Sequence, residues 1–359
     1  MELGTADAAP GELARGYLDI AELPTGGTER LPVIIAEGKS DGPELWITAS
    51  IHGNEVTGLA AAQDVMTDDL PGSLAGTVVC LPNLNPAGLR RNARTSYYHD
   101  DDPNRYFPKP DQDKEDRSRP PNLQEVIDEQ LFDLFAESAD CLISLHTAGV
   151  NSEPFNIRDR VRYGDHRTKE EAQELADELD RLVEAFGIPI VNQYDPSEQD
   201  DQSLTRSIAT SALDAAGIPA FTPELGAHDI VEEPNRAAAV TGMRNVMRAM
   251  GMLDEAVQPN EAAAEQPVDY PVKRATGPHT DTPGIARHRV QEGDTFEEGD
   301  PIADIVTPTG KHKTTVEADH DGYVIARSHG VGVYENDALT RLAVRDETDL
   351  VVPRDPDDD

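Results

Sequence analysis

Short apolar runs alternate with amphipathic segments through the first 250 residues of this chain. The apolar runs are rich in Val, Ile, Leu and Phe, as buried strands are: residues 44–53, 76–86, 140–146 and 218–226. The segments between and after them have the character of helices: residues 55–70, 122–139, 167–187, 203–217 and 234–253. This alternation predicts an α/β fold with a mixed, mostly parallel sheet flanked by helices. In such sheets, functional sites form at the carboxyl ends of the strands.

Both ends of the chain have the pattern of β structure. Residues 15–23 and 30–38, joined by "PTGGTE", predict a hairpin near the start. From residue 272 onward, short strands separated by Gly and Asp turns predict a small all-β domain. We therefore expect four consecutive parts: a catalytic domain at 1–255, a linker at 256–271, the β domain at 272–351 and a disordered acidic tail at 352–359.

The net charge of -38 excludes several classes of partner. So acidic a surface is unsuited to nucleic acid and to anionic membranes, and salt would screen its self-repulsion. Asp and Glu in excess, with few Lys, are typical of a salt-adapted cytoplasmic protein, and hence of a halophile. No apolar run has membrane-spanning length, and the first residues lack the apolar core of a signal peptide. Cys80 and Cys141 each lie in an apolar run, so we expect both to be small buried residues.

A corner between a predicted strand and a predicted helix carries two chemically active side chains. In "SIHGNEVTG", His52 and Glu55 are three positions apart. Glu55 alone could simply complement a helix N-terminus. His146 ends another predicted strand, however, and alone it would be an ordinary core or loop histidine. Together, two histidines and one carboxylate at the ligand-binding edge have the composition of a catalytic zinc site.

Further polar residues follow the same predicted edge. Glu224 ends the run 218–226, and "NPAGLRRNAR" leads from the run 76–86 into a long polar loop at 95–121 that holds Asn104 and Arg105. A loop of that length is usually functional or disordered. Each residue alone is a weak indication, since Glu224 could be a helix cap or an ion-pair partner.

The ordered set of motifs resembles the succinylglutamate desuccinylase/aspartoacylase family of deacylases, which are related to the zinc carboxypeptidases. The resemblance rests on H-x-x-E at a strand-to-helix corner, N-P followed by Arg94, then Asn104-Arg105, a strand-end L-H and a late E-L-G. It implies a zinc-carboxypeptidase-like fold. It also implies that a barrel-sandwich-like β domain covers the mouth of the active site.

The resemblance also implies a role for each matching residue. His52, Glu55 and His146 would bind one Zn²⁺ per subunit, and Glu224 would be the general base acting on a metal-activated water. Arg94 would polarise the scissile carbonyl. Asn104 and Arg105 would hold a carboxylate of a small anionic N-acyl amino acid. The implied reaction is hydrolysis of that substrate's amide bond. A carboxypeptidase acting on peptides and a non-catalytic metal- or ligand-binding protein remain as alternatives.

Some features depart from the family pattern or leave choices open. Many members carry Asp two positions before the second His, where this chain has Ser144. Residues 99–102 form an acidic run that either salt adaptation or a substrate with a cationic end would explain. We expect Arg90 and Arg91 to be ordinary solvated residues. The tyrosine near the substrate is not determined among four candidates, Tyr97, Tyr98, Tyr163 and Tyr194. The acyl group, the native metal and a homo-oligomeric state are also left open.

The predicted β domain resembles biotinyl and lipoyl carrier domains, but it lacks their attachment residue. A carrier needs an exposed Lys at a hairpin tip. In this chain the tip sequence "EADHDG" places Asp319, His320 and Asp321 there. We therefore do not expect a carrier function.

Overall fold

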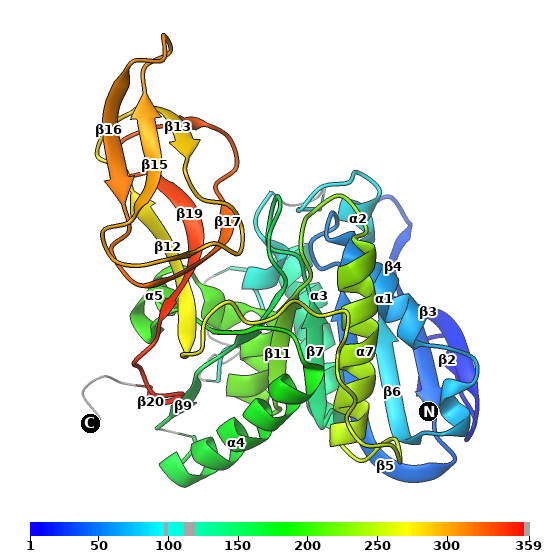
Figure 1. The fold of residues 1–359 in the computed structure, drawn as a ribbon. Coiled ribbons are helices and arrows are strands. Elements are labelled where there is room, and N and C mark those ends of the chain that lie inside the picture. The colour runs from blue at the N-terminus through cyan, green and yellow to red at the C-terminus, as the bar shows by residue number, and fades with distance from the viewer. Residues whose placement is uncertain (97–99, 111–118, 165, 355–359) are drawn as a thin grey trace.

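A computed structural model describes residues 1–96, 100–110, 119–164 and 166–354. It shows an α/β layer from which an elongated all-β part extends, drawn in orange and red in Figure 1. One 12-stranded sheet runs through both parts.

The α/β layer is built on the strands of this sheet that come first in the chain. In spatial order they are β10 (Ile190–Asn192), β8 (Phe155–Arg158), β11 (Ala220–Glu224), β7 (Cys141–Leu145), β5 (Ser40–Ala49), β6 (Ala75–Leu81), β4 (Thr28–Glu37) and β3 (Leu13–Glu22). β5 is parallel to β6 and β7, and β7 is parallel to β11. β3 and β4 form the predicted antiparallel hairpin, and β8 runs antiparallel to β11. The mixed sheet predicted from the sequence is confirmed.

Helices flank this sheet, as predicted. α7 (Glu233–Ala249) packs against both α1 (Val56–Val65) and α4 (Lys169–Phe186) (Figure 1). α3 (Leu123–Ser138) packs against β3. The start of α4 is fixed by a capping box, in which the side chains of Thr168 and Glu171 each bond to the other's backbone N–H. Its end is fixed by Gly187, whose positive φ of 78° suits glycine.

The segment 203–217 differs from the single helix predicted for it. It divides into a 3₁₀ turn (Leu204–Arg206), a short α6 (Ile208–Ser211) and a π turn (Ala212–Ala216). Ser203, with a φ of 55°, precedes these turns, and the side chain of Ser207 starts a new helix by capping the N–H of Thr210. The positive φ of Ser203 and the cap formed by Ser207 thus divide this segment into short turns, although its apolar residues have the spacing of one helix.

Several short elements were not predicted from the sequence. They include the strands β8, β9 (Val161–Tyr163) and β10 and the short helices α2 (Pro86–Leu89) and α5 (Pro196–Asp201). Strands of three or four residues are too short for an alternating pattern to be visible.

The C-terminal part is all-β, as predicted. β12 (Val272–His279) joins the large sheet through one parallel pairing with β10, and it is followed in that sheet by β19 (Ala338–Arg345), β17 (Gly322–Arg327) and β14 (Thr295–Phe296). A second sheet contains β16 (His312–Glu317), β15 (Pro301–Val306), β13 (Gly284–His288) and β18 (Gly332–Val333).

The small remaining strands lie at the two ends of the chain. β1 (Glu2–Leu3) pairs with β2 (Ala6–Asp7), and β20 (Val351–Pro353) pairs with β9. Thus Val352 and Pro353 of the predicted tail lie in a strand, and residues 355–359 lie outside the described residues. Cys80 and Cys141 are buried and unpaired. Within the described ranges, no helix has the length and apolar character needed to cross a bilayer.

Candidate metal centre and its cavity

The corner between β5 and α1 places His52 and Glu55 at the carboxyl edge of the sheet. Ser50 has a φ of 50°, and its hydroxyl donates to the backbone oxygen of Glu55 at 3.0 Å. A Cβ on Gly53 would lie 2.2 Å from the backbone carbonyl carbon of Gly88, so the tight approach of these two segments needs a glycine. Glu55 is the N-cap residue of α1, but its side chain makes no capping hydrogen bond. The carboxylate turns toward the two histidines instead.

His52, Glu55 and His146 come together as predicted, and all three are buried. Glu55 lies between the two imidazoles: its Oε1 is 2.7 Å from Nδ1 of His52, and its Oε2 is 2.9 Å from Nδ1 of His146. The atoms that could ligate a metal lie within 4.8 Å of one another. In the part of the chain that the structure describes, this is the one such cluster of His, Cys, Asp or Glu. Two imidazole nitrogens and a carboxylate fit Zn²⁺.

The charges within this cluster shift one another's protonation. Burial would raise the pKa of Glu55, but His52 and His146 outweigh it and hold that pKa well below the usual value. Burial and the charge of Arg94 would lower the pKa of His52. The charge of Glu55 and the hydrogen bond to Asp102 outweigh them, so the pKa of His52 is raised. The cluster therefore holds an ionised carboxylate, and this carboxylate favours the cationic form of His52.

Asp102 connects this cluster to the two predicted arginines. Its Oδ1 lies 3.0 Å from Nε2 of His52, and its Oδ2 accepts from Arg94 at 2.7 Å and lies 3.5 Å from Arg105. Arg94 also donates to Oε1 of Glu55 at 3.2 Å. Asp102 was not predicted to be a site residue, because in the sequence it is simply the last residue of the acidic run 99–102. Residue 99 of that run lies outside the described residues.

Asn104 and Arg105 lie on the short 3₁₀ turn Pro103–Arg105, beside the same cavity. The side-chain oxygen of Asn104 accepts a hydrogen bond from the backbone N–H of Ile208 at 2.8 Å, so this oxygen is already used within the protein. The amide nitrogen is the part that a substrate carboxylate could use.

Glu224 ends β11 next to His146, with which it forms an isolated parallel bridge. Its side chain is buried, and no residue in the described ranges forms a hydrogen bond with its buried Oε2 atom. Burial raises the pKa of Glu224. A buried carboxylate oxygen without a donor, next to the histidine–glutamate cluster, is what a proton-accepting group requires before a ligand arrives.

A cavity of about 400 Å³ joins all the predicted site residues. His52, Glu55, Arg94, Asn104, Arg105, His146 and Glu224 all line it. Tyr194 lines it as well. Tyr163 is not among its lining residues, and Tyr97 and Tyr98 lie outside the described residues. Arg90 points elsewhere, with its guanidinium 3.5 Å from Glu29.

Residues of the C-terminal part also line this cavity, and the sequence did not reveal them. Arg274 and Thr276 of β12 and Arg341 of β19 all face it. Thr276 and Arg341 are paired across the two strands, which sets them on one face. Arg341 is anchored by a hydrogen bond to the backbone oxygen of Ala148, just beyond His146. Nothing in an alternating strand pattern marks such arginines as site residues.

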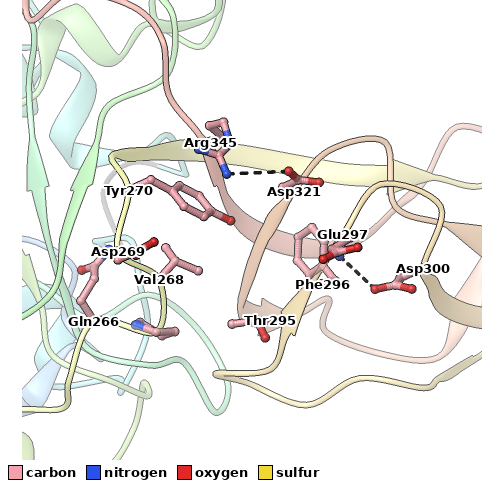
Figure 2. Close-up of a pocket in the computed structure, with 11 residues that line it drawn as sticks. Gln266, Val268, Asp269, Tyr270, Thr295, Phe296, Glu297, Asp300, Asp321 and Arg345 are labelled. Carbon is pink, nitrogen blue, oxygen red and sulfur yellow. Dashed lines mark hydrogen bonds and ion pairs between the residues drawn. The ribbon is translucent and has the colours of Figure 1, made fainter.

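A larger cavity of about 670 Å³ lies beside strands β12 and β19, but none of its lining residues belongs to the His–Glu–His cluster. Figure 2 shows Arg345 next to Tyr270 and facing Asp321. The guanidinium carbon of Arg345 is 3.6 Å from the centroid of the Tyr270 ring, and its Nη2 is 3.8 Å from an oxygen of Asp321. The carboxylate of Asp300 accepts a hydrogen bond from the backbone N–H of Glu297. The lining carboxylates do not form a cluster that could hold a metal, so the smaller cavity is the candidate site.

Known proteins whose sequences are similar to this chain are deacylases. Residues 41–250 match the succinylglutamate desuccinylase/aspartoacylase catalytic domain. The N-alpha-acetyl-L-2,4-diaminobutyric acid deacetylase of Halomonas elongata is 22% identical over 321 residues, which cover 88% of this chain and 86% of that protein.

Solved structures show the same fold. A succinylglutamate desuccinylase/aspartoacylase from Rhodobacter sphaeroides matches with a TM-score of 0.71 and 19% identity, over 93% of this chain and 95% of that one. The product-bound ectoine utilization protein EutE (DoeB) from Ruegeria pomeroyi also gives a TM-score of 0.71, with 20% identity over 95% of this chain and 98% of that one.

Proposed function

Because the chain belongs to the succinylglutamate desuccinylase/aspartoacylase family, we propose that it is a zinc-dependent deacylase. Its reaction would be hydrolysis of the amide bond of a small N-acyl amino acid to a carboxylate and an amine. The observation that carries this proposal is that one cavity holds both the His–Glu–His cluster and the buried carboxylate of Glu224, whose Oε2 has no hydrogen-bond partner among the described residues. The Halomonas elongata relative, a deacetylase of an acetylated diamino acid, supports the same class of substrate.

The cluster would hold the metal through Nδ1 of His52, Nδ1 of His146 and the carboxylate of Glu55. With only three protein ligands, a Zn²⁺ held there would remain open to the reacting groups. When bound, Zn²⁺ would supply Lewis acidity, which polarises a carbonyl and lowers the pKa of water to about 7.

Glu224 would be the general base and then the general acid. Its raised pKa lets it accept a proton from the attacking water and return it to the leaving amine nitrogen. Arg94 would donate to the oxygen on which negative charge develops. Arg94 is held close to the cluster by Glu55 and Asp102, so little rearrangement is needed.

Substrate carboxylates would be held by Arg105 and the amide nitrogen of Asn104, as a guanidinium suits a carboxylate. Arg341 and Arg274 would add positive charge from the C-terminal strands. The β domain would thus contribute binding residues as well as cover the mouth of the site.

The experiment that tests the function is amine release from a panel of N-acyl amino acids in molar KCl, before and after chelation. High salt is needed because the net charge is -38. Release that chelation abolishes and zinc restores would support a zinc deacylase. No release from any panel member by folded, zinc-loaded protein would overturn the proposal. Turnover of C-terminal peptides instead would indicate a carboxypeptidase.

A further inference from the structure

We propose that the far end of the site cavity binds a cationic side chain of the substrate through the carboxylate of Asp159. This inference rests on the proposed function and narrows it. The substrate class becomes N-acyl derivatives of amino acids with a basic side chain. Such a substrate presents a carboxylate to Arg105 at one end and a cation to Asp159 at the other.

The position of Asp159 follows from the pairing of two strands. β8 runs antiparallel to β11, so that Phe155 lies opposite Glu224 and Ile157 lies opposite Thr222. Ile157, Thr222 and Glu224 all line the cavity, and Asp159, two residues beyond Ile157, lines it too. At ~3.3 Å per strand residue, the four steps from Phe155 to Asp159 span roughly 13 Å. The cavity therefore extends along the sheet from the metal cluster to Asp159.

The hydrogen bonds of Asp159 leave half of its carboxylate available. The Oδ1 atom accepts from Nε2 of Gln193 at 3.3 Å, from Nε2 of Gln199 at 3.0 Å and from the hydroxyl of Thr210 at 3.1 Å. No residue in the described ranges donates to Oδ2, and this atom is not among the fully buried, unpartnered polar atoms. Since the residue is only 1% exposed and lines the cavity, Oδ2 reaches the cavity.

The nearby arginines are held by other partners. Arg274 donates to the side-chain oxygen of Gln193 at 2.8 Å and lies 4.5 Å from the centroid of the Tyr194 ring. Arg162 is bonded to Asp200 through both carboxylate oxygens. Burial raises the pKa of Asp159, although both arginines oppose it. A cation that arrives from the cavity would stabilise the ionised carboxylate.

The first test compares substrates that differ only in the cation. The pairs are Nα-acetyl-lysine with Nα-acetyl-norleucine, Nα-acetyl-ornithine with Nα-acetyl-norvaline, and Nα-acetyl-2,4-diaminobutyrate with Nα-acetyl-2-aminobutyrate. A hydrogen bond to a charged group predicts that kcat/KM is about 10- to 100-fold higher for at least one basic member than for its neutral partner. Equal turnover within every pair, or preference for Nα-acetyl-glutamate, would overturn this inference and leave the deacylase standing. Absence of any turnover would instead overturn the proposed function.

The second test replaces the carboxylate. Asp159→Asn should lower kcat/KM for the basic substrate by about 10- to 100-fold, mainly through KM, and leave its neutral partner within about threefold. Asp128→Asn is the matched control, because Asp128 is also a buried aspartate but does not line the cavity. It should leave the basic-to-neutral ratio unchanged. An equal loss on both substrates in Asp159→Asn would show a purely structural role and overturn the inference. If that variant does not fold, the substrate pairs decide.

Discussion

The carboxylate of Asp102 accepts a hydrogen bond from the His52 ring on the side away from Glu55. Its Oδ1 lies 3.0 Å from Nε2 of His52, while Nδ1 of the same ring faces Glu55. The contact fixes the proton on Nε2 in the neutral ring and leaves Nδ1 free to bind a metal. The other imidazole has a different partner, because Nε2 of His146 lies 3.1 Å from the hydroxyl of Ser144. In this chain the carboxylate partner is therefore on the first histidine, and it is supplied by a distant loop, whereas the second histidine has a hydroxyl partner.

Asp102→Asn should weaken zinc binding by about 10- to 100-fold, the usual cost of removing a partner that orients a ligating histidine. Competition with a chromophoric chelator measures the affinity directly. Asp101→Asn is the matched control, because Asp101 is the exposed neighbour and accepts from the hydroxyl of Tyr106 at 2.6 Å. Equal zinc affinity in the Asp102 variant and wild type would show that this contact does not orient the ligand.

Zinc affinity should fall as the pH is lowered through the raised pKa of His52. Burial favours neutral His52, but Glu55 and the hydrogen bond to Asp102 outweigh it and raise the pKa of the ring. A raised pKa means that the metal-free ring keeps its proton to a higher pH, and that proton must leave before Nδ1 can ligate. We expect a loss of about tenfold per pH unit below that pKa. A chelator competition series between pH 5.5 and 8 measures it, and a flat series would contradict the prediction.

Glu224→Gln should reduce kcat by about 10²- to 10⁴-fold, because it removes the proton acceptor and preserves the shape of the side chain. The zinc content should stay at the wild-type value, since Glu224 is not one of the clustered ligands. Steady-state rates and metal analysis of the same samples check both statements. Glu153→Gln is the control, as Glu153 is a partly buried acid that does not line the cavity. Unchanged turnover in Glu224→Gln would remove this residue from the mechanism.

The sequence was informative where strand ends carry chemistry. His146 and Glu224 end strands that are neighbours in the sheet, and His52 follows a third, so parallel pairing alone brings them to one edge. Asp102, Arg274 and Arg341 could not be found in this way. Asp102 reaches the site from a long loop, and the two arginines come from strands joined to the rest of the sheet by one parallel pairing between β10 and β12. β10 is a three-residue strand, too short to be recognised from its pattern.

Salt should stabilise the folded chain. With a net charge of -38, the compact state gathers like charges that the unfolded chain spreads apart. At 1 M salt the screening length falls to ~3 Å, so most of this repulsion disappears. We expect the thermal midpoint to rise on the order of 5 °C between 0.05 and 1 M KCl, with little further gain from screening. A differential scanning calorimetry series measures it. A midpoint that stays constant or falls over this range would contradict the prediction.

Asp128 is a buried acid whose ionisation should destabilise the fold at neutral pH. It lies on α3, is 0% exposed, and receives one hydrogen bond, from Nε2 of Gln124 to Oδ1 at 2.7 Å. Its Oδ2 is buried and has no hydrogen-bond partner in the part of the chain that the structure describes. Burial raises the pKa of Asp128 well above 3.8, and the charges of Asp102 and Glu125 add to the shift. The folded state therefore keeps a proton that the unfolded chain has already lost.

The sign of the pH dependence follows from these proton counts. Between the unfolded and folded pKa values, the native state binds more protons than the unfolded state, so stability falls as the pH rises through that window and then levels off. Asp128→Asn removes the buried charge, and it should raise the free energy of unfolding by about 1–3 kcal/mol at pH 7.5 and by little at pH 4. Urea unfolding at both pH values measures the difference. Asp133→Asn, at an exposed position on the same helix, should change stability by less than about 0.5 kcal/mol. If Asp128→Asn were destabilising at pH 7.5, the carboxylate would have to be satisfied when ionised, contrary to its burial and its unpartnered Oδ2.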